Sequence, residues 1–580
     1  MLTRRQFVVA SAGAGAGILV PAILKATRTN AQVTSPQIPK FTEPLATPFA
    51  GPPPNPLTIA SGSHSFHSTL GAGPTWGYGG DNYLGPTIEV TRGTPLRLTA
   101  VNNLGSHPLP LDLRLHGVQP TDVTSPRVSI HLHGSNTEPQ SDGYPTDTFT
   151  PGQTYIYNFN NNQEAATLWY HDHALGITGQ NVMAGLAGVY LLRDIDDPVG
   201  GNGPLGIPAG APYEIPLVLQ DRILNPDGSI FHPAMWEPEF LGDVATVNGK
   251  AWPNLNVDRT VYRFRIVNGS SARTYNLKLS SQQPIIQIGT DGGMLNAPVQ
   301  LSKLLLSPGE RADVLIDFSN SLPGDKIVLQ NDAVSPFPFG RSNLFIQYPN
   351  LPEIMQFTVK QGAAAPKPIP QTLRLLKPPI QPIATPPVRQ RFLTLVEVLN
   401  PPGGSPGLAV VLLNYVYWDE AEKYPELMER PKVDTVEQWN IINLQPVAHP
   451  MHLHLVLFQI LNRQKIDTSR YLKAYLASGP RTVRTHHEPL GGSTVPASYP
   501  PPDPTPFVIG PARQPAPNER GWKDTVLVNP NEVTRLIVPF GAQATANLPF
   551  GNSFTGRYVW HCHMIEHEDN EMMLPFEVVP

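Results

Sequence analysis

Cysteine is almost absent from this chain, whose 580 residues include only Cys562. A single cysteine cannot form an intramolecular disulfide, so the fold does not depend on disulfide cross-links. The roles that remain for Cys562 are a buried apolar residue, a free thiol or a metal ligand. Its sequence neighbours must decide among these roles.

Long apolar runs are also lacking beyond the first 31 residues, so we expect no membrane span in the mature chain. Residues 1–31 themselves are predicted to be an export signal. The twin-arginine pattern Thr3-Arg-Arg-Gln-Phe7 precedes a Gly- and Ala-rich apolar run, and Thr29-Asn-Ala31 offers small residues for cleavage. An uncleaved anchor and an ordinary secretory signal are the alternatives. The pattern therefore predicts a periplasmic or extracellular protein, exported by the twin-arginine route.

Positive charge is not in excess either. The whole chain has 41 Lys and Arg against 46 Asp and Glu, and the predicted signal holds four of the basic residues and no acidic one. The mature chain then has 37 basic and 46 acidic residues, a formal net charge of −9. This balance argues against nucleic acid or an anionic membrane as a partner.

Helical periodicity is scarce, whereas runs that alternate apolar and polar residues are frequent. Residues 96–101 and 261–267 are examples, and Gly, Pro, Asn and Asp flank such runs. An alternation of period two bounded by turn residues predicts half-buried strands. The 67 prolines and 48 glycines fit many short strands joined by turns, so we expect an all-β fold.

Two compositionally biased stretches predict linkers. Residues 198–212 are rich in Gly and Pro, and residues 361–388 are rich in Pro, Ala and Gln. They divide the chain into domains at 45–197, 212–360 and 390–580, each about the size of one β-sandwich. A further Pro- and Gly-rich stretch, at 488–520, predicts a long surface loop inserted in the third domain.

Histidine is scarce in the middle of the chain, where His232 is the only one of 17 between residues 200 and 448. Ten others form four clusters near the two ends. These are His131 and His133; His171 and His173; His449, His452 and His454; and His561, His563 and His567. One His-x-His pair could be two surface residues on a strand, but four such clusters in one chain make that interpretation improbable.

The spacing of the histidines carries chemical meaning. Residues i and i+2 of a strand face the same side, so each His-x-His places two imidazoles together to hold one metal or bridge two. On such a strand, His561 and His563 face one way and Cys562 the other. Two different metal sites are therefore expected on opposite sides of one strand.

On the cysteine side, His567 and Met572 follow Cys562 by five and ten residues. A thiolate, two imidazoles and a weak axial methionine form a blue-copper electron-transfer site. His449 is the natural second imidazole. Met573 is the alternative axial ligand, although the ten-residue spacing favours Met572.

Eight histidines then remain, four from each end of the chain, which are too many for one metal and suit a cluster of three. The first and third domains must meet to form it, and the middle domain, without copper ligands, would be a spacer. Zinc fits less well, because catalytic zinc usually takes three protein ligands and a water.

The chain resembles the multicopper oxidases over its whole mature length. The resemblance rests on His131-Leu-His-Gly134, Trp169-Tyr-His-Asp-His173, His449-Pro-Met-His-Leu-His454 and His561-Cys-His563. It is most similar to the branch of spore-coat laccases, bilirubin oxidases and o-aminophenol oxidases, through residues 563–568, 522–526 and 307–311. The resemblance implies three cupredoxin-like Greek-key β-sandwich domains and four coppers per chain.

The resemblance also implies which residues bind each copper. Type 1 copper would be held by His449, Cys562, His567 and Met572; type 2 copper by His131 and His452; and the type 3 pair by His133, His171, His173, His454, His561 and His563. Asp142 and Glu568 match carboxylates that deliver protons in this branch. The alternatives are that Asp142, in Ser-Asp-Gly-Tyr, is a turn residue and that Glu568 is a solvated acid.

The expected activity is that of a laccase-like oxidase. It would couple one-electron oxidation of a small phenolic or aminophenolic reductant to four-electron reduction of dioxygen to water. Bilirubin oxidase or o-aminophenol oxidase activity is the first alternative. Oxidation of Cu(I) or another metal ion is disfavoured, because the 488–520 insertion has no methionine. A non-catalytic copper-binding protein would not need eight further histidines.

Overall fold

A computed structural model of the chain describes residues 33–580, apart from 48–49, 201–202, 341–347, 400–408, 480, 484–492 and 496. The predicted export signal, residues 1–31, lies outside the described residues. Within these residues six large sheets form three successive pairs, so the all-β prediction is confirmed. Among the described residues, no helix has the length and apolarity needed to cross a membrane.

The first sandwich is built from residues 50–193. One sheet has the order β1 (Ala50–Gly51), β4 (Thr87–Thr91), β9 (Ala187–Arg193), β8 (Ala166–Asp172) and β6 (Ile130–His133). The other has the order β3 (Gly73–Tyr78), β2 (Leu57–His64), β5 (Leu96–Asn103) and β7 (Thr154–Phe159). The alternation predicted for residues 96–101 is confirmed, because the buried positions of β5 are every second residue.

The second sandwich is built from residues 214–359. Its larger sheet has the order β13 (Lys250–Ala251), β12 (Val244–Val247), β10 (Glu214–Leu224), β15 (Val261–Asn268), β20 (Arg311–Asp317), β17 (Ile285–Thr290) and β18 (Gly293–Leu301), with β11 (Ile230–Phe231) beside β10. The other sheet has the order β14 (Asn254–Val257), β22 (Glu353–Val359), β21 (Lys326–Asn331), β16 (Tyr275–Leu279) and β19 (Leu304–Leu306).

Strand β15 differs from its prediction, since both of its faces are buried. The polar face carries Arg263 and Arg265, which are at most 2% exposed. Their guanidinium groups pair with Asp197, which follows the first sandwich, and with Glu214 at the start of the second. A charged face can be buried when each charge is paired and hydrogen-bonded, and alternation alone does not reveal such partners.

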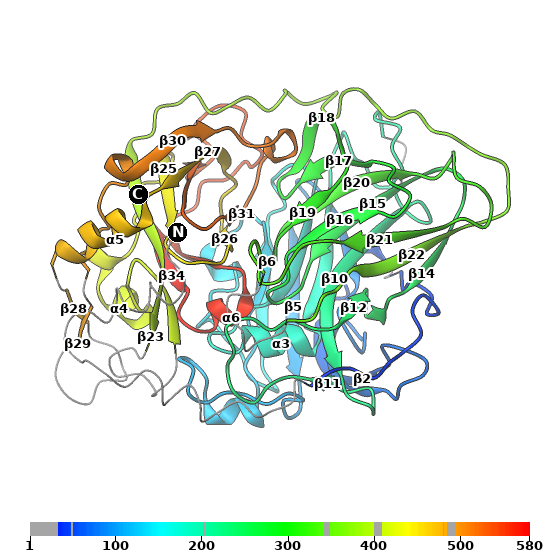
Figure 1. The fold of residues 1–580 in the computed structure, drawn as a ribbon, viewed down its shortest axis with the longest axis horizontal. Coiled ribbons are helices and arrows are strands. Elements are labelled where there is room, and N and C mark those ends of the chain that lie inside the picture. The colour runs from blue at the N-terminus through cyan, green and yellow to red at the C-terminus, as the bar shows by residue number, and fades with distance from the viewer. Residues whose placement is uncertain are drawn as a thin grey trace.

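The third sandwich is built from residues 389–578. One sheet has the order β24 (Ala409–Leu413), β23 (Arg389–Leu399), β25 (Val436–Asn443), β32 (Glu532–Pro539), β27 (Gln459–Ile466) and β30 (Val508–Arg513). The other has the order β31 (Thr525–Val528), β26 (His449–Leu453), β33 (Gly556–Cys562) and β34 (Met573–Val578), and β28 (Arg481–Val483) pairs with β29 (Ser493–Val495). Figure 1 shows this sandwich in yellow to red and the second in green, on opposite sides of the molecule.

In the part of the chain that the structure describes, helices are few and short. They are α3 (Thr178–Ala184), α4 (Trp418–Lys423), α5 (Thr468–Ala477) and α6 (Ile565–Glu568), with the 3₁₀ turns η1 (Pro120–Val123), η2 (Pro139–Ser141), η3 (Pro425–Leu427), η4 (Thr505–Phe507) and η5 (Pro517–Glu519). Helix α6 lies against α3 near the middle of the molecule, between the first and third sandwiches (Figure 1). The short turn after β33 thus meets the first sandwich.

The two Pro-rich stretches behave differently. Residues 361–388 contain no helix or strand and run along the molecule from β22 to β23 (Figure 1). Arg374 in this segment makes two hydrogen bonds, of 2.6 and 2.7 Å, to Glu164 of the first sandwich. The prediction of a loop over 488–520 is wrong for Ser493–Val495, which is strand β29, and for Val508–Arg513, because β30 pairs with β27 and forms the edge of its sheet. A strand at the edge of a sheet pairs on one side only. A Pro-rich segment can therefore form such a strand, although proline has no N–H group to donate.

Candidate metal centre

Strand pairing brings the histidine motifs together within each sandwich. Strand β6 lies antiparallel to β8, with His131 opposite His171. Strand β26 lies antiparallel to β33, with His452 opposite His561 and Met451 opposite Cys562. All ten histidines of the four clusters are at most 2% exposed. Ten buried imidazoles need partners, because burying an unpaired polar group is costly.

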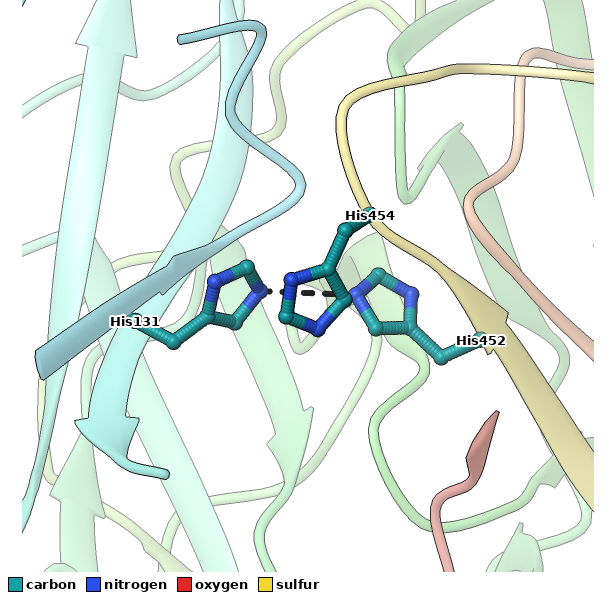
Figure 2. A group of neighbouring side chains, drawn as sticks. All are labelled: His131, His452 and His454. Atoms are coloured by element: carbon teal, nitrogen blue, oxygen red, sulfur yellow. Dashed lines mark hydrogen bonds between the residues drawn. The ribbon is translucent and has the colours of Figure 1, made fainter. Parts of the chain in front are cut away.

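Eight of these imidazoles, four from each of the two outer sandwiches, converge on one another. Their ring nitrogens form close pairs: Nε2 of His131 and His452 at 3.5 Å, Nε2 of His173 and His561 at 3.3 Å, Nε2 of His454 and His561 at 3.3 Å, and Nδ1 of His133 and Nε2 of His563 at 3.2 Å. Figure 2 shows His131 and His452 pointing toward each other from opposite sides of His454. The first and third sandwiches therefore meet at this cluster, as predicted.

Three sets of histidine nitrogens in this cluster are close enough to hold a metal ion each. The atoms of each set lie within 4.8 Å of one another, and the sets are His131, His452 and His454; His133, His171 and His563; and His173, His454 and His561. Nitrogen lone pairs that point at a common position repel one another unless a proton or a metal ion lies between them. The arrangement therefore fits a cluster of metal ions.

The protonation state of these histidines also fits metal binding. Burial lowers the pKa of His171 to about 3 and that of His173 to about 4, so both are neutral at pH 7. Nε2 of His171 is buried and has no hydrogen-bond partner among the described residues. A neutral imidazole with an unused ring nitrogen is the form that binds copper or zinc.

Backbone carbonyl groups orient four of the rings, including those of His131 and His452. His131 Nδ1 donates to the carbonyl oxygen of Asp142 at 2.6 Å, and His452 Nδ1 donates to that of Asp524 at 2.9 Å. Such bonds fix the tautomer and leave Nε2 free for a metal ion. The two Nε2 atoms that face each other across 3.5 Å are the free ones.

The opposite side of β33 carries a second, smaller set. Cys562 Sγ lies 3.4 Å from His449 Nδ1 and 3.8 Å from His567 Nδ1, and all three residues are buried. Met572 belongs to the same apolar cluster as Cys562, whereas Met573 lies in another one with Tyr144 and Trp418. Burial raises the pKa of the Cys562 thiol. A metal ion would be needed to stabilise the thiolate there.

Asp142 and Glu568 both lie against the histidine cluster. Asp142 ends η2, as a turn residue does, and its Oδ2 accepts a hydrogen bond from His454 Nδ1 at 2.7 Å. Glu568 is 1% exposed, so the alternative of a solvated acid is wrong. Its Oε2 lies 3.0 Å from His561 Nδ1 and its Oε1 lies 3.4 Å from His173 Nδ1.

The environments of the two carboxyl groups push their pKa values in opposite directions. Burial raises the pKa of Asp142 well above its usual value, and the nearby carboxylate of Asp147 adds to this effect. Burial also opposes ionisation of Glu568, but His173 and His561 outweigh it and lower the pKa of that carboxyl. Paired carboxyl groups with separated pKa values are typical of sites that transfer protons.

The sequence alone did not identify two charged residues that lie at the cluster. Asp524 accepts a hydrogen bond from His133 Nε2 at 3.0 Å, and Arg311 of the middle sandwich pairs with Asp524. Both lie in segments, 522–526 and 307–311, that the resemblance had marked only as typical of one branch. Nothing in the local pattern shows that these segments meet, since 213 residues separate the two side chains.

Comparison with known proteins gives a consistent result. Multicopper oxidase sequence profiles match residues 122–197, 233–337 and 417–580. The chain is 36% identical over 552 residues to a laccase of Bacillus subtilis, covering 90% of this chain and 93% of the relative. It is 34% identical over 544 residues to the multicopper oxidase LPR1 of Arabidopsis thaliana, covering 89% and 86%.

Solved structures of multicopper oxidases also resemble this chain in fold. A variant of the McoA multicopper oxidase from Aquifex aeolicus superposes with a TM-score of 0.68 at 26% sequence identity, covering 93% of this chain and all of that chain. A multicopper oxidase from Pediococcus acidilactici superposes with a TM-score of 0.67 at 24% identity, covering 94% and 93%. The three sandwiches are therefore of the cupredoxin-like kind.

Proposed function

The chain belongs to the multicopper oxidase family, and from this premise we propose a ligand set for each of its coppers. The enzyme is a laccase-like, copper-dependent oxidoreductase that uses dioxygen as electron acceptor. We assign type 1 copper to His449, Cys562, His567 and Met572, type 2 copper to His131 and His452, and the type 3 pair to His133, His171, His173, His454, His561 and His563.

The observation that carries the assignment is the position of the two sets on opposite sides of β33. Cys562 faces His449 and His567, while its neighbours His561 and His563 face the eight-histidine cluster. When bound, copper supplies one-electron oxidation on the cysteine side and reduction of dioxygen on the histidine side. Cys562 is joined to both of these histidines by the backbone, which gives a short covalent connection between the two sites.

Protons must reach the histidine cluster as dioxygen is reduced, and we propose Asp142 and Glu568 for this task. Both are buried and contact histidines of the cluster, at His454 and at His561 and His173 respectively. The raised pKa of Asp142 favours the protonated form of its carboxyl group. The lowered pKa of Glu568 favours the ionised carboxylate, which is the form that has a site for a proton. A donor and an acceptor beside one reaction site is the arrangement that proton transfer needs.

We also propose domain boundaries at 45–197, 212–360 and 390–580. The three pairs of sheets fall within these limits, at 50–193, 214–359 and 389–578 to within one residue. The Pro-rich insertion belongs to the third domain and extends its sheet through β30.

Twin-arginine export to the periplasm or the exterior remains our proposal for residues 1–31, and sequencing the mature N-terminus tests it.

We propose small phenolic or aminophenolic compounds as the reducing substrates. Two of the similar proteins, from Bacillus subtilis and Bacillus stratosphericus, are laccases at 36% and 34% identity. Bilirubin is the alternative organic reductant. Cu(I) is a weaker candidate, because the 488–520 insertion contributes no methionine.

Oxygen uptake with a panel of phenols, o-aminophenol, bilirubin and Cu(I) tests this proposal. We expect turnover of phenols and o-aminophenol well above that of Cu(I), with background set by the Cys562→Ser variant. Uptake with Cu(I) alone would contradict the proposed substrate class while leaving the copper sites in place.

A further inference from the structure

Arg311, at the start of β20 in the middle sandwich, uses all five of its N–H donors around the histidine cluster. Nη1 and Nη2 donate to Asp524 Oδ1 and Oδ2 at 2.6 and 2.5 Å. The remaining N–H groups donate to the carbonyl oxygens of Thr167 at 2.9 Å, Gly309 at 3.2 Å and Asp291 at 3.2 Å. The side chain is 1% exposed. A guanidinium with five fixed donors holds its partners in one geometry.

The partner carboxylate in turn contacts two histidines of the cluster. Asp524 Oδ1 lies 3.0 Å from His133 Nε2, and the backbone carbonyl of Asp524 accepts from His452 Nδ1 at 2.9 Å. An ionised carboxylate only accepts hydrogen bonds, so Nε2 of His133 carries the proton and Nδ1 is left free. That free Nδ1 lies 3.2 Å from His563 Nε2. Asp524 thus selects the ring nitrogen that each histidine presents to the cluster.

We propose that Arg311 is a positioning residue, which acts through Asp524 to set the tautomer and orientation of His133 and His452. The proposal rests on the ligand assignment given above, in which His452 binds type 2 copper and His133 binds one type 3 copper. In this arrangement the middle sandwich contributes to the copper cluster without supplying a ligand. It does so at the junction of all three sandwiches, because Thr167 belongs to the first and Asp524 to the third.

Close packing around Arg311 supports a positioning role. A Cβ atom at Gly134, where φ is +87°, would lie 2.4 Å from Arg311 Nη2 and 2.6 Å from Asp524 Oδ2. At Gly309 a Cβ atom would lie 2.6 Å from the ring of His563. Because these two glycines have no side chain, the guanidinium and the cluster can approach each other closely. A side chain at either position would prevent this approach.

A second set of ion pairs joins segment 522–526 to the middle sandwich. Lys523 Nζ lies 3.0 Å from Glu310 and 2.8 Å from Asp291. Lys523 precedes Asp524, and Glu310 precedes Arg311, so two adjacent ion pairs join segment 522–526 to segment 307–311. The ion pairs of Lys523 keep the two segments in contact when the Arg311 guanidinium is replaced. A variant at Arg311 can therefore be tested in a folded protein.

The test compares Arg311→Lys with a matched control, Arg263→Lys. Arg263 is also fully buried and in the same sandwich, but it pairs with Asp197 and Asp313. Lysine keeps the charge but has three donors in place of five. We expect Arg311→Lys to weaken type 2 copper binding about 10- to 100-fold, the usual effect of losing an outer partner of a metal ligand. The control should leave type 2 copper binding unchanged.

Type 2 copper is measured by its electron paramagnetic resonance signal and by copper per chain during dialysis against a chelator. The blue absorption of type 1 copper in the same sample serves as the reference for folded protein. We expect the ratio of type 2 to type 1 copper to fall in Arg311→Lys and to remain that of the wild type in Arg263→Lys. Equal ratios in wild type and Arg311→Lys would overturn the proposal.

A double-mutant cycle with Asp524→Asn tests whether Arg311 acts through Asp524. We expect the double variant to be no worse in type 2 copper retention than Asp524→Asn alone, whereas fully additive losses would contradict the proposed path. If Arg311→Lys does not fold, Asp524→Asn alone must still lower the ratio, and an unchanged ratio refutes the role. Absence of type 2 copper from the wild type would instead refute the ligand assignment.

Discussion

Replacing Cys562 with serine is expected to abolish both the blue colour and oxidase activity while the protein stays folded. The thiolate sulfur is a soft ligand that donates electron density to copper, and a serine hydroxyl is neither soft nor ionised at neutral pH. Cys562 is fully buried in the core of the third sandwich. Serine has nearly the same volume, and it can keep the contact that Met564 N makes with Sγ at 3.4 Å. Absorption spectra and oxygen uptake measure the two losses.

The control for this variant is Met573→Leu. Met573 lies one residue from Met572 but packs with Tyr144, Trp418 and Val559, away from Cys562. We expect Met573→Leu to keep the blue absorption. Retention of the colour in Cys562→Ser would disprove the type 1 assignment, and loss of the colour in Met573→Leu as well would show that the loss is not specific to the cysteine.

Replacing Glu568 with glutamine is expected to slow oxygen reduction by about 10²- to 10⁴-fold, the usual contribution of a positioned proton-transfer group. Glutamine keeps the shape of the side chain but cannot accept and release a proton. Glu568 contacts His561 and His173 through its two oxygens and is almost fully buried. Both copper content and blue absorption should remain those of the wild type. Steady-state oxygen uptake at saturating reductant measures the effect.

Glu566→Gln provides the matched control. Glu566 is also buried and lies on the same helix, α6, but it lines a cavity with Trp236 and His232 on another side. We expect this variant to retain most of the activity. Equal activity of Glu568→Gln and wild type would exclude proton transfer by Glu568, and an equal loss in both variants would indicate a general disturbance of α6.

Local sequence patterns were sufficient to predict the parts of the site that lie on single strands. The alternation at His561, Cys562 and His563 predicted two faces, and the structure places different partners on each. The prediction that the first and third domains meet is also confirmed, because histidines of both domains contact one another in the cluster. Such predictions succeed because strand geometry relates i and i+2 directly.

Long-range pairing could not be predicted in the same way. Asp524 and Arg311 contact each other from different sandwiches, and each looks like an ordinary charged residue in its own segment. Arg263 and Arg265 likewise bury the polar face of β15 through acids distant in the sequence. Charge pairing across domains leaves no local periodicity, so only the folded chain shows it.

The middle sandwich illustrates the difference. Its lack of clustered histidines predicts that it supplies no copper ligand, and the expected role is that of a spacer. The structure adds Arg311, which reaches Asp524 beside His133. A domain without ligands can therefore still determine how ligands are oriented.

We propose above that two separate sets of side chains hold copper on opposite sides of β33. Metal analysis of the purified, copper-loaded protein tests it most directly, with Cys562→Ser measured alongside. The ligand sets predict about four coppers per wild-type chain and about three in the variant, since the serine removes one site and leaves the eight-histidine cluster intact. One copper per wild-type chain, or zinc in place of copper, would contradict the account.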